Sequence, residues 1–587
     1  MNKREINWVA VKNPIMTRWS KNVNPENPLR EYPRPQMKRD EWLNLNGLWD
    51  YAICPKSQDY IDTFDGKILV PFPLESSLSG VKKSLKSTQS LWYHRKFSIP
   101  QSWKDKKILL HFGAVDWDTK VWINKSQVGT HQGGYTPFSF EISKFLKLDQ
   151  ENEILVKVLD PTDKGGQERG KQSLNPQIIW YTAVSGIWQT VWLEPVSASF
   201  IDSFTLDSDI DNNHLNLFLY IHKLKPEFNI RIQIYSDKTE IINFLSDKNI
   251  LTLDVPNPQL WSPNNPFLYD LVIKIELEDH IIDEIKSYFG MRKISLIERK
   301  DGIFNVALNN EQIFQYGILD QGYWPDGLYT APTDEALEYD IKIAKELGFN
   351  MIRKHVKIEP ARWYYHCDRI GILVWQDMPN GGFTNLGANI NNEDQFKFER
   401  KEFDKNQYLQ ELDSMIHTLR NSPSIVAWVP FNEGWGQFDT DLVLGRIKRA
   451  DPSRLVDAAS GWNDFGIGDI CDRHNYPNPI MPHKNQIKSR AAIIGEFGGL
   501  GLEIENHIWQ FKNKFIYRNF RNKEELINKY EKLVRKLKKI IEKGLSAAIY
   551  TQLTDVEQEI NGLLTYDREI IKMDKERLIE INLSLYN

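Results

Sequence analysis

The sequence has few cysteines, no excess of positive charge and no long apolar run, and each absence excludes a class of protein. Its three cysteines, Cys54, Cys367 and Cys471, lie far apart among 587 residues and show no CxxC spacing. An odd, dispersed set of thiols argues against a disulfide framework and against a structural zinc site. We therefore expect the chain to work in a reducing compartment.

The charge balance and the hydropathy narrow down the partners. The chain carries 74 Lys and Arg against 79 Asp and Glu, a formal net charge of −5, and its basic residues are scattered. A polyanion needs a concentrated basic surface, so we expect no nucleic-acid partner. No stretch reaches the roughly 18 apolar residues of a membrane span, and the N-terminal segment lacks the apolar run of about 7–15 residues that marks a secretory signal. The expected location is the cytoplasm, with no membrane contact.

The sequence is rich in aromatic side chains and long enough for several domains. It contains 19 Trp, 23 Tyr and 28 Phe, which can pack large cores or stack on the faces of sugars and bases. At about 100–200 residues per domain, the length predicts roughly three to five domains. Hydrophobic residues make up 41% and charged residues 26%, which is typical of globular chains with well-buried cores.

The first half of the chain has the pattern of two β-sandwiches. Residues 1–197 contain short alternating apolar and polar segments separated by Gly, Pro and Asn, such as LWYHRKFSI and TKVWINKSQVG. This period of two with closely spaced turns predicts an antiparallel jelly roll. Residues 198–298 repeat the pattern in shorter strands, such as NIRIQIYS, and their number suits an immunoglobulin-like sandwich.

In residues 299–587 the pattern changes to short apolar runs that alternate with helical stretches. There are eight such runs: IFQYGI, FNMIRKH, ILVWQDM, IVAWVPFNE, RLVDAASG, DICDRHNYP, AAIIGEFGG and SAAIYTQ. Eight strand-and-helix units in a segment near the usual length of about 250 residues predict a (β/α)8 TIM barrel. Active sites of this fold lie at the C-terminal ends of the strands, where these runs end in polar or aromatic residues.

Two glutamates stand at the ends of two of these runs. Glu433 ends the fourth run and Glu496 lies in the seventh, each where a strand is expected to end, so both are expected on the same face of the barrel. Glycosidic cleavage needs one protonated carboxyl for the leaving oxygen and one ionised carboxylate for the anomeric carbon. A shared apolar site separates the two pKa values through desolvation and repulsion. The alternative, that each glutamate caps a helix or pairs with an arginine, explains the two together less well.

Several long strings have a common resemblance. PRPQMKRDEWLNLNGLWDY (33–51), SGIWQTVWLEPV (185–196), SYFGMRKISL (287–296) and GFNMIRKHVKIEPARWYYHCDRIGILVWQDMP (348–379) occur in this order. They are similar to the start and the closing strand of the sugar-binding jelly roll, the end of the immunoglobulin-like domain, and barrel strands two and three of glycoside hydrolase family 2. That family includes β-galactosidases, β-glucuronidases and β-mannosidases. The resemblance covers nearly the whole chain and implies a catalytic barrel as the last domain.

The resemblance gives roles to individual residues. Glu433 matches the general acid/base of the family and Glu496 its nucleophile, which implies a retaining double displacement with carboxyl groups about 5–5.5 Å apart. Asn432 matches the residue that binds the 2-hydroxyl of the sugar. Tyr476 matches the tyrosine that holds the nucleophile, and His355 matches a histidine beside the terminal sugar.

Three more residues are expected near the sugar. Asp320 follows strand one, where the family places hydroxyl-binding groups, and Trp435 should form a wall of the pocket. Strand eight carries Tyr550 and Gln552 where better-known members place a Trp. Each of these supporting residues also has a structural interpretation: Asp320 could cap its turn, Trp435 could be ordinary packing, and His355 and His474 could be core histidines. We expect Asp377, which ends strand three, to orient a neighbour rather than to contact substrate.

The sequence departs from the best-known members where substrate specificity is decided. Segment 315–334 lacks the His- and Glu-rich stretch with which β-galactosidases help to hold a metal ion, so we expect no metal and no other cofactor. The jelly-roll segment 177–188 lacks the usual acidic residue, which weakens galactose recognition of the usual kind. Asn561, Gly562 and Leu563 stand where glucuronidases carry an Asn-x-Lys pair for the uronate, so a glucuronate substrate is disfavoured.

These observations predict a three-domain, retaining, exo-acting β-glycosidase that hydrolyses terminal sugars from oligosaccharides or glycosides, with β-galactosidase-like specificity as the best match. A β-mannosidase or furanosidase-like specificity stays open, and so does a catalytically silent carbohydrate-binding protein. The presence of both Glu433 and Glu496 argues against the silent protein. Carbohydrate is the expected partner, and a homo-oligomer is compatible with the sequence because related enzymes often assemble.

Overall fold

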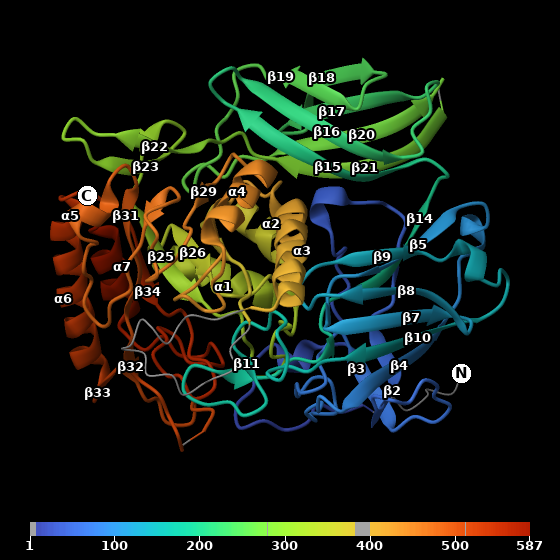
Figure 1. Cartoon of the computed structure of the whole chain (residues 1–587), viewed down its shortest axis with the longest axis horizontal. Coiled ribbons are helices and arrows are strands. Elements are labelled where there is room, and N and C mark those ends of the chain that lie inside the picture. Colours follow the sequence, from blue (N-terminus) through green and yellow to red (C-terminus); the bar gives the residue numbers. More distant parts are fainter. Residues whose placement is uncertain (1–7, 279, 382–399, 511, 587) are drawn as a thin grey trace.

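Two β-sandwiches and a parallel barrel make up the protein. The computed structural model describes residues 8–278, 280–381, 400–510 and 512–586. Figure 1 shows the jelly roll (blue to teal) beside the barrel (yellow to red), and the immunoglobulin-like sandwich (green) across one end of the barrel. The expected fold class is therefore confirmed.

The jelly roll packs a four-stranded sheet against a six-stranded sheet. Its strands are β1 (Leu43–Asn44), β2 (Gly47–Pro55), β3 (Gly66–Val70), β4 (Gln89–Phe97), β5 (Lys107–Phe112), β6 (Val115–Asp116), β7 (Asp118–Ile123), β8 (Ser126–Gln132), β9 (Phe138–Glu141), β10 (Asn152–Leu159), β11 (Gln172–Ser173), β12 (Tyr181–Thr182), β13 (Gly186–Ile187) and β14 (Val191–Val196). The sheets have the orders β1-β14-β5-β9 and β3-β2-β4-β10-β7-β8. Trp49, Tyr93 and Leu110 are among the side chains buried between them, which is the burial that the alternating pattern predicts.

The second sandwich has seven strands in two sheets. They are β15 (Phe200–Asp209), β16 (His214–His222), β17 (Asn229–Ser236), β18 (Thr239–Ser246), β19 (Ile250–Asp254), β20 (Tyr269–Leu277) and β21 (His280–Phe289). The orders are β15-β16-β19 and β18-β17-β20-β21. In β17, Ile230, Ile232 and Ile234 are fully buried and the residues between them are not, so one face of the strand supplies the core.

Eight parallel strands form the barrel. They are β25 (Gln315–Asp320), β26 (Met351–Lys354), β27 (Leu373–Asp377), β28 (Ile425–Val429), β29 (Leu455–Val456), β30 (Ile470–Cys471), β31 (Ala491–Gly498) and β34 (Leu545–Thr551). Neighbours pair in parallel around the barrel, apart from β29 and β30, which are not paired in the residues described. Successive side chains alternate between two cores: Met351 faces the barrel interior and Ile352 the helices.

Helices surround these strands. They are α1 (Asp334–Glu346), α2 (Ala361–Ile370), α3 (Glu402–Leu419), α4 (Thr440–Ala450), α5 (Lys484–Ile487), α6 (Lys523–Ile541) and α7 (Lys575–Leu583). In α1 the Thr333 side chain accepts a hydrogen bond from the Ala336 N–H, and Asp334 lies in the first turn; both stabilise the exposed N–H groups of a helix start. Among the helices described, none is long and apolar enough to cross a membrane.

The immunoglobulin-like sandwich contacts the N-terminal ends of the barrel strands. Arg292 Nη2 donates to the Ile425 carbonyl at the start of β28 (2.8 Å), and Trp261 Nε1 donates to the Asp368 carbonyl in α2 (2.7 Å). The strands β22 (Ile294–Glu298), β23 (Phe304–Leu308) and β24 (Glu311–Gln312) extend from this end, whereas β32 (Leu500–Leu502) pairs with β33 (Arg518–Phe520) after β31. The C-terminal strand ends are thus free of this sandwich.

Candidate active site

Glu433 lies on a tight turn four residues after the end of β28 at Val429. Its φ is +52°, a left-handed conformation that is costly for a residue with a side chain, and Gly434 continues the turn with φ +71°. The turn is held by its backbone: the Glu433 N–H donates to the Ser460 carbonyl and Trp462 Nε1 donates to the Glu433 carbonyl, both at 2.8 Å. The carboxyl group is therefore fixed at the C-terminal end of the barrel, with 14% of the side chain exposed.

Glu496 lies within β31, where the pairing of that strand with β34 is irregular between Ile494 and Phe497. Tyr476 donates a hydrogen bond to Glu496 Oε2, and Arg353 Nη1 lies 3.4 Å from Oε1. The preceding Gly495 is needed for space, because a Cβ at this position would lie 1.9 Å from Asp472 Oδ2. The contact with Tyr476 is the one that the sequence resemblance implied.

His474 lies between the two glutamates. Its Nδ1 is 2.8 Å from Glu433 Oε1 and 3.6 Å from Glu496 Oε1, and its Nε2 is 2.9 Å from Ser460 Oγ and 3.4 Å from Asp472 Oδ2. Oxygen atoms of the two carboxyl groups and Nδ1 all lie within 4.8 Å of one another. An oxygen of one carboxyl group thus lies within 4.8 Å of an oxygen of the other, which is compatible with the separation of about 5–5.5 Å between the carboxyl groups of retaining glycosidases.

The surroundings shift the two carboxyl pKa values in opposite directions. Burial raises the pKa of Glu433, and repulsion from Glu496 adds to the rise. Burial alone would also raise the pKa of Glu496, but the positive charges of His474 and Arg353 hold it below its ordinary value. Burial disfavours a charged His474, yet the neighbouring carboxylates, led by Glu496, raise its pKa to about 10. The site thus favours a protonated Glu433 beside an ionised Glu496.

These three groups could also hold a divalent metal ion by their spacing. Glu433, His474 and Glu496 offer two carboxylate oxygens and one imidazole nitrogen, a donor set that zinc accepts. However, Glu496 is already bound by Tyr476 and Arg353, and His474 Nδ1 is bound by Glu433. The groups are saturated by one another, which favours acid–base chemistry over metal binding.

A buried arginine connects the strands around the glutamates. Arg353, which points into the barrel from β26, forms two 3.0 Å contacts with the carboxylate of Asp377 and donates to Asn432 Oδ1 at 2.8 Å. Asp377 Oδ2 also lies 2.9 Å from His355 Nδ1. Asp377 therefore orients Arg353 and His355, the kind of role the sequence indicated for it.

The remaining predicted residues divide into two groups. The ring of Trp435 lies 6.2 Å from His355 and 5.3 Å from Trp180 of the jelly roll, between their centroids. Asp320 instead accepts hydrogen bonds from Lys354 and from the Gly322 N–H, as the turn-capping alternative has it. Gln552 is also fully engaged, by Gln321 at 2.8 Å and Asn561 at 2.9 Å. In the part of the chain that the structure describes, neither residue forms a hydrogen bond or an ion pair with Glu433 or Glu496.

Sequence reasoning missed several groups of this site. The sequence pattern leaves His474 open between a core residue and a functional one, and it does not point to Arg353 or Asp472. The spacing of Asp472 and His474, two apart on the chain after β30, was the available signal, because such residues face the same side of an extended segment. Nothing in the sequence showed that the jelly roll would place Trp180 against Trp435.

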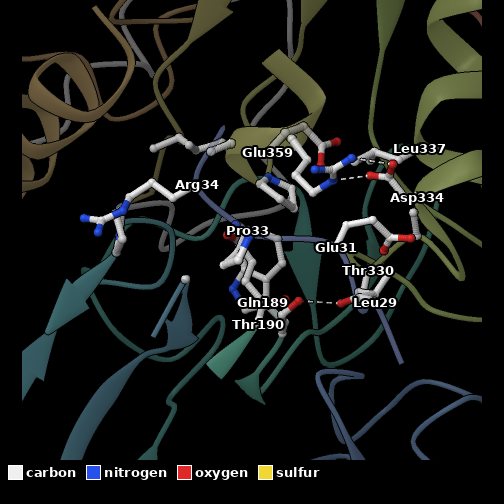
Figure 2. Close-up of a pocket in the computed structure, with 18 of the residues that line it drawn as sticks. Leu29, Glu31, Pro33, Arg34, Gln189, Thr190, Thr330, Asp334, Leu337 and Glu359 are labelled. Carbon is white, nitrogen blue, oxygen red and sulfur yellow. Dashed lines mark hydrogen bonds and ion pairs between the residues drawn. The ribbon is translucent and has the colours of Figure 1, made fainter. Parts of the chain in front are cut away.

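A separate cavity lies between the jelly roll and the barrel. Figure 2 shows it, with Gln189 and Thr190 on the jelly-roll side and Asp334, Leu337 and Glu359 on the barrel side. It encloses about 100 Å³ and is mostly apolar. None of the eight predicted site residues lines it, so we assign it to the domain interface and not to the active site.

Three segments of the chain match descriptions of one family. Residues 68–194 match "Glycosyl hydrolases family 2, sugar binding domain", residues 199–292 match "Glycosyl hydrolases family 2", and residues 329–493 match "Glycosyl hydrolases family 2, TIM barrel domain". The chain belongs to glycosyl hydrolase family 2.

Individual relatives agree with this membership. A β-galactosidase of Thermoanaerobacter pseudethanolicus is 27% identical over 400 residues, covering 62% of this chain and 47% of the relative. A putative β-glucuronidase of Formosa agariphila is 27% identical over 387 residues, covering 63% of this chain and 34% of the relative. The chain thus spans about half or less of the length of these curated relatives. The β-D-glucuronidase structure of Dictyoglomus thermophilum has the same fold, with a TM-score of 0.74 at 19% identity over 94% of this chain and 98% of that one.

Proposed function

We propose that the protein is a retaining, exo-acting β-glycosidase in which Glu496 is the nucleophile and Glu433 the general acid/base. The observation that carries the proposal is the pair of carboxyl groups, with oxygens within 4.8 Å and pKa values shifted apart. An ionised Glu496 attacks the anomeric carbon while a protonated Glu433 donates to the leaving oxygen. Glu433, now ionised, then removes a proton from the water molecule that releases the sugar from Glu496.

Neighbouring groups support each step. Tyr476 and Arg353 hold Glu496 in place for attack, and His474 holds the Glu433 carboxyl. Asn432 contributes a buried Nδ2 that has no hydrogen-bond partner among the residues described, while its Oδ1 is fixed by Arg353. A buried, unpaired amide N–H favours a ligand acceptor, and the 2-hydroxyl that the family resemblance implies for Asn432 would fit it.

The specificity that we propose first is that of a β-galactosidase. It rests on relatives named β-galactosidase and on the Asn561-Gly562-Leu563 stretch, which lacks the lysine of glucuronidases. A β-mannosidase or furanosidase-like specificity stays open as an alternative to the β-galactosidase specificity. β-Glucuronidase is the second candidate, because relatives and neighbours in structure carry that name.

A panel of 4-nitrophenyl β-glycosides tests the proposal. We expect the wild-type protein to hydrolyse at least one of them, and proton NMR of the first product formed to show the β-anomer, as double displacement requires. An initial α-anomer would contradict the retaining mechanism. A protein that binds sugars but cleaves none of the panel would instead be the catalytically silent carbohydrate-binding protein.

A further inference from the structure

A loop of the jelly roll reaches the catalytic end of the barrel. Glu168 in this loop forms a buried ion pair with Arg400, and the N–H groups of Arg169 and Gly170 donate to the Asn380 carbonyl at 3.2 and 2.9 Å. Asn380 in turn accepts a hydrogen bond from the Asn432 N–H at 3.1 Å. The loop is therefore connected to the turn that carries Glu433.

Gly170 allows this close approach. Its φ is +57°, and a Cβ on it would lie 2.6 Å from the Val356 carbonyl oxygen, directly after His355. A residue without a side chain is needed here for both reasons. The neighbours of Gly170, Arg169 and Lys171, are consequently brought to the mouth of the site.

Both of these neighbours are buried cations. Arg169 is 3% exposed and Lys171 is 5% exposed. The guanidinium carbon of Arg169 lies 5.7 Å from the Trp180 ring centre, and Lys171 Nζ lies 5.8 Å from that of Trp435 and 5.6 Å from that of Tyr181. Since the rings of Trp180 and Trp435 are 5.3 Å apart, the two cations flank one aromatic wall.

Neither cation has an acceptor for its side-chain N–H groups among the residues described. Arg169 Nε is buried without a hydrogen-bond partner, and Lys171 Nζ has only the two ring contacts. The other buried lysines and arginines each donate to at least one oxygen; they are Lys157, Lys354, Lys357, Lys572, Arg39, Arg292, Arg353, Arg400, Arg454, Arg490 and Arg568. Buried charges normally have a partner of opposite charge or a hydrogen-bond acceptor, and among the described residues Arg169 and Lys171 are the exceptions.

Two carboxyl groups lie near Lys171 without pairing with it. The charge of Lys171 opposes the rise that burial causes in the pKa of Glu433 and of Glu559. Glu559 accepts a hydrogen bond from Tyr181, and Glu433 is engaged by His474. The ammonium group therefore remains available to a ligand at the site.

We propose that Arg169 and Lys171 form a cationic subsite that binds an anionic substituent, a carboxylate or a sulfate ester, on the sugar held beside Glu433. Charge-assisted hydrogen bonds to such a group would supply the acceptors that both side chains lack. This inference rests on the proposed glycosidase function and narrows its substrate to an acidic sugar. In this subsite the cations come from the jelly roll. Glucuronidases carry their lysine after strand eight, where this sequence has Leu563.

The test compares matched acidic and neutral substrates. We would measure kcat/KM for 4-nitrophenyl β-galactoside, its 6-sulfate and the corresponding galacturonide with the wild type, Lys171→Met and Arg169→Met. The ratio of acidic to neutral kcat/KM should fall about ten- to a hundredfold in each variant, as expected for a lost charged hydrogen bond. The galacturonide and the sulfate distinguish the two anionic groups.

Two further variants separate charge from folding. Lys171→Arg should keep the selectivity because it keeps the cation. Lys164→Met, on the same loop but with 59% of its side chain exposed, should leave the ratio unchanged. An unchanged ratio in Lys171→Met and Arg169→Met, in folded protein, would overturn the subsite and leave the glycosidase proposal intact.

If the wild type cleaves none of these glycosides, the glycosidase proposal fails and calorimetric binding decides the subsite. Tighter binding of galacturonate or galactose 6-sulfate than of galactose, lost in Lys171→Met, would uphold it. Equal binding of the charged and neutral sugars, or none, would overturn it.

Discussion

The two glutamates stand in differently built parts of the same barrel. Glu496 lies within the barrel strand β31 and is held by Tyr476 and Arg353, all of which belong to the barrel. Glu433 lies on a left-handed turn whose neighbour Asn432 is tied through Asn380 to a jelly-roll loop. The surroundings of the proposed nucleophile are thus completed by one domain, and those of the proposed acid/base by two. Variants on each side should therefore fail in different ways.

The largest effect is expected on the nucleophile side. Glu496→Gln keeps the shape but removes the attacking charge, so kcat/KM should fall about 10⁴-fold or more for every substrate. Steady-state kinetics with several leaving groups would measure it. A loss that varies with the leaving group would show that Glu496 is not the nucleophile.

The acid/base side should respond to the leaving group. Glu433→Gln should lower kcat/KM by about 10²–10⁴-fold for alkyl glycosides, which need a proton on the departing oxygen. It should lower it much less for 4-nitrophenyl glycosides, which leave without help. Equal losses of kcat/KM for alkyl and 4-nitrophenyl glycosides would show that Glu433 does not protonate the leaving group.

The histidine between the two sides should control the pH dependence. His474 is held positive by its carboxylate neighbours, and its charge lowers the pKa of both Glu433 and Glu496. In His474→Asn both pKa values should rise, so the acidic and alkaline limbs of the kcat/KM profile both move to higher pH. Loss of the charged contact should also cost about 10–100-fold at the optimum.

A histidine elsewhere gives the control for this variant. His214 pairs with Asp254 at 2.9 Å in the immunoglobulin-like sandwich, so His214→Asn should leave the pH profile as in the wild type. A profile that stays unchanged in His474→Asn would show that this imidazole does not set the charge of the glutamates.

The smallest effect is expected from loosening the jelly-roll loop. Gly170→Ala would push against the Val356 carbonyl and should lower kcat/KM by roughly tenfold by displacing the acid/base side. Gly302 also has a positive φ, +78°, but nothing lies within 4 Å of a Cβ there. Gly302→Ala therefore shares the cost of about 1–2 kcal/mol for left-handed backbone without the clash. Similar melting temperatures and activities for both variants would show that the loop contact is unimportant.

The sequence predicted the fold from changes in hydrophobic period. The eight apolar runs correspond to β25–β31 and β34, although β29 and β30 are only two residues long. Glu433 and Glu496 could be placed because strand ends of a parallel barrel meet on one face. The catalytic roles of the two glutamates are predictions, based on the geometry of the site and on the family resemblance.

Other parts of the site could not be predicted from local pattern. Arg353 lies within a buried strand, where a charge has no counterpart nearby in sequence; its partner Asp377 comes from the next strand. Asp320 and Gln552 could not be judged because their partners, Lys354 and Gln321, are decided by packing. Lys171 precedes Glu433 by 262 residues (433 − 171 = 262), so no local pattern connects the two.

The place of the immunoglobulin-like sandwich has a practical consequence. It contacts the barrel at the start of β28 through Arg292, whereas Glu433 follows the other end of that strand. Figure 1 shows the sandwich in green across one end of the barrel. Its strand β18 carries exposed side chains, including Leu245 at 48%. Attaching the protein to a bead or an electrode through a cysteine introduced in β18 would therefore leave the catalytic mouth facing the solution.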